Sequence, residues 1–280
     1  MTNKHSRRVD PKVYDKNYYL SHCCGFAEFK RSYGSEEFER LHELFKNIKV
    51  KKNMNVLDVG CGRGDAAFYF ARRGANVVGI DYAKAGILLA KKALVKQKNL
   101  KGTVTFETMD AKKLIFKKNS FDMVVCIDVF EHLYPEELDV AMSEVHRVLK
   151  PNGILFVQTE PNKIYLDFTH KFYIYPVSQM LIRINRLITG KTFPGLPKDP
   201  RNDVHKVQHV NEPTFFYLKS LFARHHFKGE ISQNISLLKE VISWKDWLYN
   251  VIVLWYPLSL LYPFILLFSY NYICIMKAKK

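Results

Sequence analysis

The segment that most constrains the fold runs from Val56 to Asp65 and reads VLDVGCGRGD. An apolar, β-branched run reaches an acidic residue, and glycines follow at positions 60, 62 and 64 before helix-like sequence resumes. A second carboxylate, Asp81, closes the next apolar run, NVVGID. Glycines let the backbone approach a ligand, and an acid at the end of the following strand can accept hydrogen bonds from ribose hydroxyls. The segment therefore predicts a site for a nucleotide-type cofactor.

The glycine spacing narrows the choice of cofactor. It is G-x-G-x-G rather than the G-x-G-x-x-G of dinucleotide-binding proteins, and Asp58 precedes the first glycine by two residues. A carboxylate there would repel a pyrophosphate but would pair with the ammonium group of an amino acid. With these features the chain resembles the class I S-adenosylmethionine-dependent methyltransferases, and the resemblance implies S-adenosylmethionine as the cofactor.

Short β-branched runs alternate with helical stretches along most of the chain, which predicts a parallel sheet with helices on both faces. The expected strands are 55–59, 76–81, 103–106, 121–127, 153–159, 229–233 and 270–276, and the expected helices are 36–48, 65–73, 83–96, 135–148 and 214–227. We therefore expect an α/β, Rossmann-like fold with a seven-stranded, mostly parallel sheet and an antiparallel last strand.

Two segments interrupt this rhythm and define the expected domain organisation. Residues 163–212 are rich in proline, basic and aromatic residues, and an insertion after the carboxyl end of a strand is expected to cover the active site. The expected units are 1–48 as an N-terminal cap and helix, 49–162 as the cofactor-binding core, 163–212 as a substrate cap with an amphipathic helix at 178–188, 213–246 as the completion of the core, 247–269 as an apolar helical hairpin, and 270–280 as the final strand and basic tail.

The apolar hairpin leaves three interpretations open. No charged residue occurs from Trp247 to Met276, which is long enough to span a bilayer. Pro257 and Pro263 interrupt the stretch, and a single span would place the terminal lysines opposite a cytosolic catalytic domain. We therefore favour contact with one leaflet over a buried or oligomer-facing element and over a true span. The expected location is cytoplasmic, peripheral or monotopic on the cytosolic membrane face.

Charge and cysteine content say less about the binding partners and the cellular location of the protein. The formal net charge of +16 suits a solvated surface, an anionic membrane or, less well, nucleic acid. The charged N-terminus has no apolar segment behind it, so no signal peptide is expected. The five cysteines show no C-x-x-C spacing, and we expect them to be reduced.

The resemblance implies a set of cofactor-binding residues. Asp58 and the glycine loop would hold the methionine part, Asp81 the ribose hydroxyls, Tyr82 the adenine ring, and Asp110 the adenine amino group. The same acids also commonly cap helices, so the ordered set carries more weight than any member. The full predicted set is Asp58, Gly60, Cys61, Gly62, Gly64, Asp81, Tyr82, Asp110, Ala111, Ile127 and Asp128.

The end of the fourth predicted strand narrows the range of possible methyl acceptors. It reads DVFEH from Asp128, where DNA and some RNA or protein amino-group methyltransferases carry a Pro-Pro-aromatic motif. The DxxEH pattern resembles the ubiquinone-pathway O-methyltransferases and related small-molecule (type 11) enzymes. That resemblance implies O-methylation of a hydrophobic or lipid-linked small molecule such as a quinone precursor, a phenol or a lipid-linked sugar. An RNA methyltransferase and a non-catalytic cofactor-binding scaffold remain alternatives.

Candidate catalytic residues follow from the same strand end. We expect His132 to act as a general base, with Glu131 orienting it or contacting the substrate. Tyr18 and Tyr19 are candidates to close over the cofactor. His205 and His209 could line the pocket or bind a metal, but we expect surface polar residues and no metal site.

Overall fold

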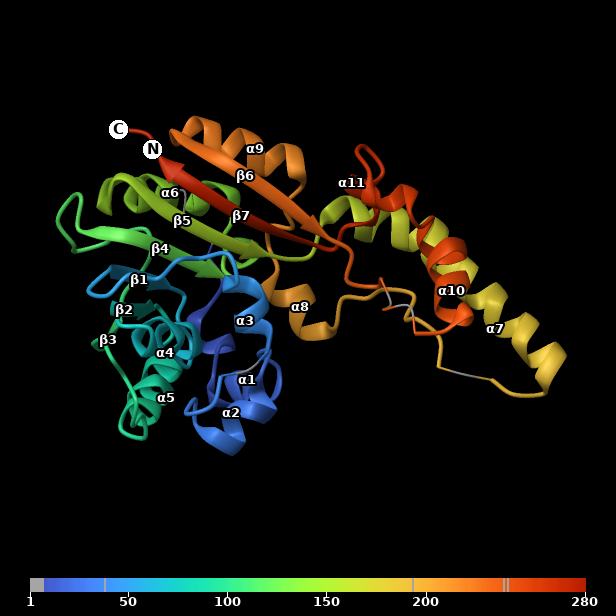
Figure 1. The fold of residues 1–280 in the computed structure, drawn as a ribbon, viewed down its shortest axis with the longest axis horizontal. Helices are drawn as coiled ribbons and strands as arrows, with labels where there is room; N and C mark the ends of the chain where they lie inside the picture. Colours follow the sequence, from blue (N-terminus) through green and yellow to red (C-terminus); the bar gives the residue numbers. More distant parts are fainter. Residues whose placement is uncertain (1–7, 38, 193, 239, 241) are drawn as a thin grey trace, which may run out of the picture.

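The computed structural model describes residues 8–37, 39–192, 194–238, 240 and 242–280. One seven-stranded sheet forms its centre, in the order β3-β2-β1-β4-β5-β7-β6. The first five strands are mutually parallel, whereas β7 pairs antiparallel with both β5 and β6. This order confirms the predicted sheet with its antiparallel final strand, and Figure 1 shows helices on both of its sides.

The strands lie close to the predicted positions. They are β1 (Asn55–Val59), β2 (Asn76–Asp81), β3 (Val104–Thr108), β4 (Phe121–Ile127), β5 (Leu149–Thr159), β6 (Phe227–Asn234) and β7 (Asn271–Ala278). The α-helices of the core are α3 (Glu39–Phe45), α4 (Asp65–Arg72), α5 (Lys84–Leu94), α6 (Pro135–Val148) and α9 (Phe215–Arg224). Before them lie the 3₁₀ turn η1 (Pro11–Val13) and the helices α1 (Lys16–Ser21) and α2 (Phe26–Ser32), and the short 3₁₀ turn η2 (Phe130–His132) follows β4.

Alternating residues of the strands build two separate cores. Side chains of successive strand residues point to opposite faces. Val56 therefore packs with α3, α4 and α5, whereas Leu57 packs with α6 and α9. The same alternation recurs at Val125 and Val124 of β4. Because both faces of the central strands β1 and β4 are covered, these strands are mostly apolar and buried, as is typical of a parallel sheet.

The insertion after β5 differs from its prediction. A π-helix, η3 (Tyr165–Ile174), continues directly into α7 (Tyr175–Thr189), and α8 (Asp203–Gln208) follows after a proline-rich loop. Figure 1 shows α7 and α10 (Trp244–Leu254) extending side by side away from the sheet. The expectation that 163–212 as a whole covers the active site is therefore wrong for α7.

A third apolar cluster holds this projection, which we call the arm, together. Val177 and Leu181 of α7 and Tyr249 and Val253 of α10 all belong to this cluster. The arm also contains the 3₁₀ turn η4 (Leu258–Leu260) and α11 (Ile265–Phe268), so 247–269 is a bent, partly buried series of short helices. Within the described residues, no helix combines the length and apolar character needed to span a bilayer.

Candidate cofactor and acceptor site

A cavity of about 370 Å³ opens where the carboxyl ends of β1, β2 and β4 meet. In open α/β sheets, ligands bind at these strand ends. All but one of the predicted site residues line the cavity, namely Asp58, Gly60, Cys61, Gly62, Asp81, Tyr82, Asp110, Ala111, Ile127, Asp128, Glu131 and His132. The exception is Gly64, which turns the chain into α4.

The glycine loop requires its glycines for two different reasons. Gly60 and Gly64 have φ values of +70° and +88°, which L side chains rarely adopt. A Cβ on Gly60 would lie 2.5 Å from Cγ2 of Val129 at the cavity, and a Cβ on Gly64 would lie 2.5 Å from Cζ of Phe106 in the core. Gly60 therefore allows the loop to lie against Val129 after β4, whereas Gly64 allows the start of α4 to lie against Phe106 of β3.

Asp58 presents a buried carboxylate oxygen that lacks a hydrogen-bond partner. Its residue is 2% exposed, and Oδ2 has no partner among the described residues. Burial, followed by repulsion from Asp81 and Asp65, raises the pKa of Asp58 to about 8. An unpartnered buried carboxylate is costly, and a bound ammonium group would both pair with this oxygen and restore the charged form.

Asp81, at the end of β2, is held by the surrounding backbone. Its Oδ1 accepts a hydrogen bond from the Ala83 N–H at 2.8 Å, and its Oδ2 accepts one from the Gly62 N–H at 2.9 Å. The hydroxyl of Tyr19 also donates to Oδ2, at 3.3 Å. Burial raises the pKa of Asp81. These contacts fix the orientation of the Asp81 carboxylate. Tyr19 gives it the same kind of hydrogen bond, from a hydroxyl group, that ribose hydroxyls would give.

Arg63 fastens the N-terminal segment over the glycine loop. Its guanidinium group is almost fully buried and donates to the carbonyl oxygens of Tyr19 and Cys24, each at 2.7 Å. It also pairs with Asp65 at 2.8 Å. Tyr18 and Tyr19 both line the cavity as a result, which supports the expectation that this segment covers the cofactor site.

The contacts of the remaining predicted cofactor-binding residues are of kinds that also occur in ordinary turns and cavity walls. Asp110 accepts a hydrogen bond from the backbone N–H of Lys112 at 2.9 Å and lies 3.4 Å from the ammonium of that lysine, so it also fits the turn-capping interpretation. The Tyr82 ring packs edge-on to Tyr14 at 5.6 Å. Cys61, Ala111 and Ile127 contribute small or apolar surface to the wall.

Asp128 has a strong protein partner that was not anticipated. Arg40, on α3, forms two hydrogen bonds with its carboxylate at 2.8 and 2.9 Å and a third with Oε1 of Gln158. Arg40 also lines the cavity. The pair joins α3 to the end of β4, so Asp128 serves at least to position this edge of the site.

His132 lies at the other end of the cavity, in contact with the N-terminal segment. Its Nδ1 is 2.9 Å from the hydroxyl of Tyr14 and 3.3 Å from the carbonyl oxygen of Gln208. Burial lowers the pKa of His132 to about 4, so the imidazole is neutral at pH 7. Both interactions use Nδ1, and no described residue forms a hydrogen bond with Nε2, which remains available to a ligand.

Glu131 does not hydrogen-bond to His132, contrary to one of its predicted roles. Its Oε2 instead accepts a hydrogen bond from the Thr159 hydroxyl at 2.7 Å. Burial and the charge of Asp128 raise the pKa of Glu131. The side chain that contacts the imidazole of His132 is therefore Tyr14, and the carboxyl group of Glu131 lies in the cavity wall.

The structure corrects the prediction for His205 and His209. Both line the cavity, and their rings stack at 4.6 Å. Nδ1 of His209 is buried without a partner among the described residues, and burial lowers the pKa of His209 to about 3. One ligand atom each from Glu131, His132 and His209 lie within 4.8 Å of one another. This geometry could hold a metal ion, so the predicted absence of a metal stays an untested prediction.

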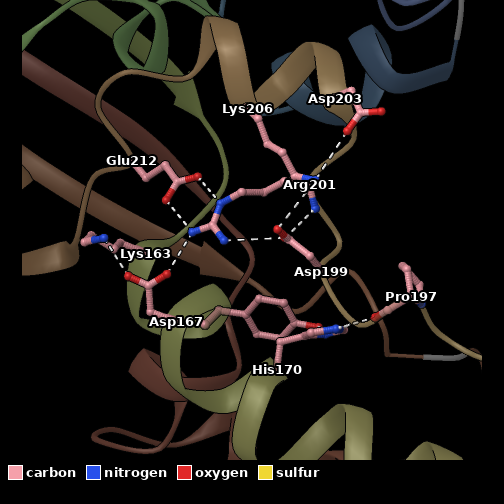
Figure 2. Close-up of polar contacts among 10 residues, drawn as sticks. Lys163, Asp167, His170, Pro197, Asp199, Arg201, Asp203, Lys206 and Glu212 are labelled. Atoms are coloured by element: carbon pink, nitrogen blue, oxygen red, sulfur yellow. Dashed lines mark hydrogen bonds and ion pairs between the residues drawn. The ribbon is translucent and has the colours of Figure 1, made fainter.

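An ion-pair network holds α8 in place and thereby brings the two histidines to the cavity. Figure 2 shows the Arg201 guanidinium between Glu212 and Asp167. Its Nε lies 2.6 Å from Glu212 and its Nη2 lies 2.8 Å from Asp167, on the π-helix. Asn202 then caps α8 by accepting a hydrogen bond from the His205 N–H. The network connects the base of the arm to the wall of the site.

Comparison with known proteins identifies the family. Residues 57–157 match the family model described as a methyltransferase domain. This part of the chain is a methyltransferase domain of the class I S-adenosylmethionine-dependent type. The cofactor of this family is S-adenosylmethionine, and the unpartnered carboxylate oxygen of Asp58 at the cavity fits the ammonium group of its methionine part.

Individual relatives support this family and limit what can be transferred from them. The methyltransferase is 30% identical over 170 residues to a ubiquinone biosynthesis O-methyltransferase of Pelagibacter ubique, covering 61% of this chain and 66% of that one. It is 38% identical over 147 residues to a sterol 24-C-methyltransferase of Gibberella zeae, covering 49% and 35%. The chain spans about half the length of the curated relatives it matches.

The solved structures agree on the fold. A putative S-adenosylmethionine-dependent methyltransferase from Listeria monocytogenes superimposes with a TM-score of 0.56 at 15% identity, covering 89% of this chain and 99% of that one.

Sequence reasoning missed Tyr14, Arg40 and Arg63 as members of the site. Arg63 sits inside the glycine motif, where a long cation between glycines could have indicated an anchoring role. Tyr14 and Arg40 reach partners 118 and 88 residues away, and no local pattern marks contacts of that kind.

Proposed function

We propose that this methyltransferase transfers a methyl group from S-adenosylmethionine to a hydroxyl oxygen of a hydrophobic or lipid-linked small molecule at a membrane surface. The observation that carries the proposal is the neutral, Tyr14-held imidazole of His132 in the same cavity as the cofactor-binding acids. The relatives named for ubiquinone biosynthesis and for sterols support a lipophilic acceptor.

In the proposed reaction, Asp58 and Asp81 bind the cofactor and His132 removes the proton of the acceptor. When bound, S-adenosylmethionine supplies an electrophilic methyl group on its sulfonium sulfur. Asp58 would bind its ammonium group and Asp81 its ribose hydroxyls, and these two contacts would hold it in one orientation. His132 accepts the hydroxyl proton of the acceptor through Nε2 when the acceptor oxygen is methylated. The products are the methyl ether and S-adenosylhomocysteine, and the proton leaves His132 to solvent.

The surroundings of His132 suit a phenolic or similarly acidic hydroxyl. An imidazole whose pKa is about 4 is unprotonated at neutral pH but is a weak base. It can therefore assist a hydroxyl that already loses its proton readily, as a phenol does. The aromatic rings of Tyr14, Tyr18 and Tyr270 line the same cavity and offer apolar contact to a ring-bearing acceptor.

Membrane contact through 247–269 forms part of the proposal. Leu258, Leu261 and Tyr262 on this segment are exposed, although α10 and α11 bury their other faces. A protein that lies on the cytosolic face of a bilayer would meet its lipophilic acceptor there. Tyr270 supports this arrangement because it packs against the arm and also lines the cavity.

The test uses purified protein, methyl-labelled S-adenosylmethionine and host lysate, with Asp81→Ala as the blank. Products are partitioned into organic-soluble, RNA, protein and small aqueous fractions. Label in the organic fraction that is lost in the blank and reduced in His132→Gln would support the proposal. Label in RNA would replace it with an RNA methyltransferase. Cofactor binding without label in any fraction would favour a scaffold role.

A further inference from the structure

The last two turns of α7 expose their apolar face to solvent. Met180, Ile184, Leu187 and Ile188 are spaced at i, i+4, i+7 and i+8, which places them on one side of the helix. Val177 and Leu181 continue this side toward the base of the arm, where they are partly buried in the cluster that also contains Val253 of α10. Beyond that cover, Leu187 and Ile188 are 85% and 78% exposed. A surface helix normally buries such a stripe, and here the stripe continues past its protein partner.

The same stretch of chain is strongly cationic. From Phe168 to Lys198 the sequence contains no aspartate or glutamate. It contains five lysines and arginines, which are Lys171, Arg183, Arg186, Lys191 and Lys198. Apolar side chains with flanking cations and no acids are the composition of a helix that lies in the headgroup region of an anionic bilayer.

We propose that the last two turns of α7 insert into the headgroup region of an anionic lipid bilayer and extend the membrane contact to the end of the arm. The inference deepens the membrane part of the proposed function, because it adds a second binding element and specifies the lipid charge. It does not depend on methyl transfer.

Charge decides between a bilayer and a second copy of the chain as the occupant of this face. The whole chain carries a net charge of +16, and pairing two arms would bring two groups of cations together. An anionic surface instead gains from every cation near it. The tryptophans agree with this choice, because Trp244, Trp247 and Trp255 all lie on the arm and are all exposed. Tryptophan is favoured at membrane–water interfaces.

The position of the tryptophans also supplies the measurement. They are the three tryptophans of the chain, so tryptophan emission, excited selectively over the tyrosines, reports on the arm alone. The full chain is titrated with vesicles of phosphatidylcholine containing about 30% phosphatidylglycerol and with vesicles of pure phosphatidylcholine. We expect a blue shift and co-sedimentation with the first, and binding at least about tenfold weaker with the second.

Two variant pairs test α7 itself. Leu187→Glu with Ile188→Glu should weaken binding to the anionic vesicles by about tenfold or more, because each places a charge where insertion needs an apolar group. Arg183→Ala with Arg186→Ala should remove most of the preference for anionic lipid. The matched controls lie on or next to α5, away from the arm: Val95→Glu for the first pair, and Lys91→Ala with Lys92→Ala for the second. These positions are exposed, and the controls should bind as the wild type does.

Three outcomes would overturn the inference. If Leu258→Glu with Leu261→Glu abolishes binding while both α7 pairs bind like the wild type, contact through 247–269 stands and α7 has no part in it. If the wild type binds both vesicle types equally, the cations do not act on lipid. If light scattering shows a dimer that the Leu187→Glu, Ile188→Glu variant dissociates, and vesicles do not bind, the face belongs to a second copy.

Discussion

Replacing Asp58 with asparagine should stabilise the protein without cofactor while weakening cofactor binding. The carboxyl group is 2% exposed, and burial raises its pKa from 3.8 to about 8. In the unfolded chain it ionises near its ordinary pKa. The folded state therefore binds a proton that the unfolded state has lost, and stability falls as the pH rises from about 4 to about 8.

The size of the change in stability follows from the pKa shift of Asp58. At about 1.4 kcal/mol per pKa unit, roughly four units correspond to an upper limit of about 6 kcal/mol. The substituted asparagine would keep an oxygen that accepts the Ala67 N–H, but its amide group would replace the unpartnered Oδ2 at a cost of about 1–3 kcal/mol. Subtracting this cost from the upper limit, we expect Asp58→Asn to gain at most about 3–5 kcal/mol at pH 8 and to lose about 1–3 kcal/mol at pH 4, where almost none of the ionisation penalty remains.

The assay is urea unfolding at pH 5, 6.5 and 8 without cofactor, followed by calorimetric titration with S-adenosylmethionine. Loss of a charged hydrogen bond should weaken binding about 10- to 100-fold. Wild-type binding should also release close to one proton at pH 7, which the variant should not. Asp122→Asn is the control, and it should lower the stability at pH 8. Hydrogen bonds from Lys150 and the Asn55 N–H lower the pKa of Asp122 despite its partial burial, so the charged carboxylate stabilises the folded state. A midpoint for Asp58→Asn at or below that of the wild type at pH 8 would refute the reasoning.

Three further predictions concern the groups around the cavity. Tyr14→Phe removes the hydroxyl partner of His132 and should lower kcat about tenfold with little change in KM for S-adenosylmethionine; an unchanged kcat would exclude a role in positioning the base. Arg63→Met leaves the carbonyl oxygens of Tyr19 and Cys24 without their donor and should cost about 3 kcal/mol in urea unfolding, with faster proteolysis of the N-terminal segment; equal proteolysis would argue against the anchoring role. Burial keeps the folded-state pKa of His132 and His209 at about 4 and 3. Unfolded histidines take up protons below about 6.5, so stability should fall as the pH drops from about 6.5 toward 4, and His209→Gln should flatten that slope.

The core of the fold could be predicted from local sequence. Short apolar runs alternate with helical periodicity, and each predicted strand from 55–59 to 270–276 has a counterpart in the sheet. The predicted cofactor acids met in one cavity for the same reason. Asp58, Asp81 and Asp110 each follow or close a strand, and the carboxyl ends of parallel strands share one edge of the sheet.

The acceptor side of the site could be predicted only in part. His132 follows β4, so its place at the sheet edge was predictable. His205 and His209 lie on or next to α8, whose position depends on the Arg201 pairs with Glu212 and Asp167 rather than on a strand. Tyr14 reaches His132 only because the N-terminal segment folds back across the glycine loop.

The sequence by itself therefore determined the α/β sheet, the edge of the sheet at which the cofactor-binding acids lie, and the positions of the segments 163–212 and 247–269. The periodicity of apolar residues and the position of an acid after a strand are local properties of the sequence. Tertiary structure decided which residues orient His132, which histidines reach the cavity, and that α7 points away from the site instead of covering it. Those outcomes depend on how ion pairs and apolar faces distant in the chain match in space. The exposed end of α7 shows this most clearly, since its amphipathic pattern predicts a helix but only packing against α10 determines which turns remain uncovered.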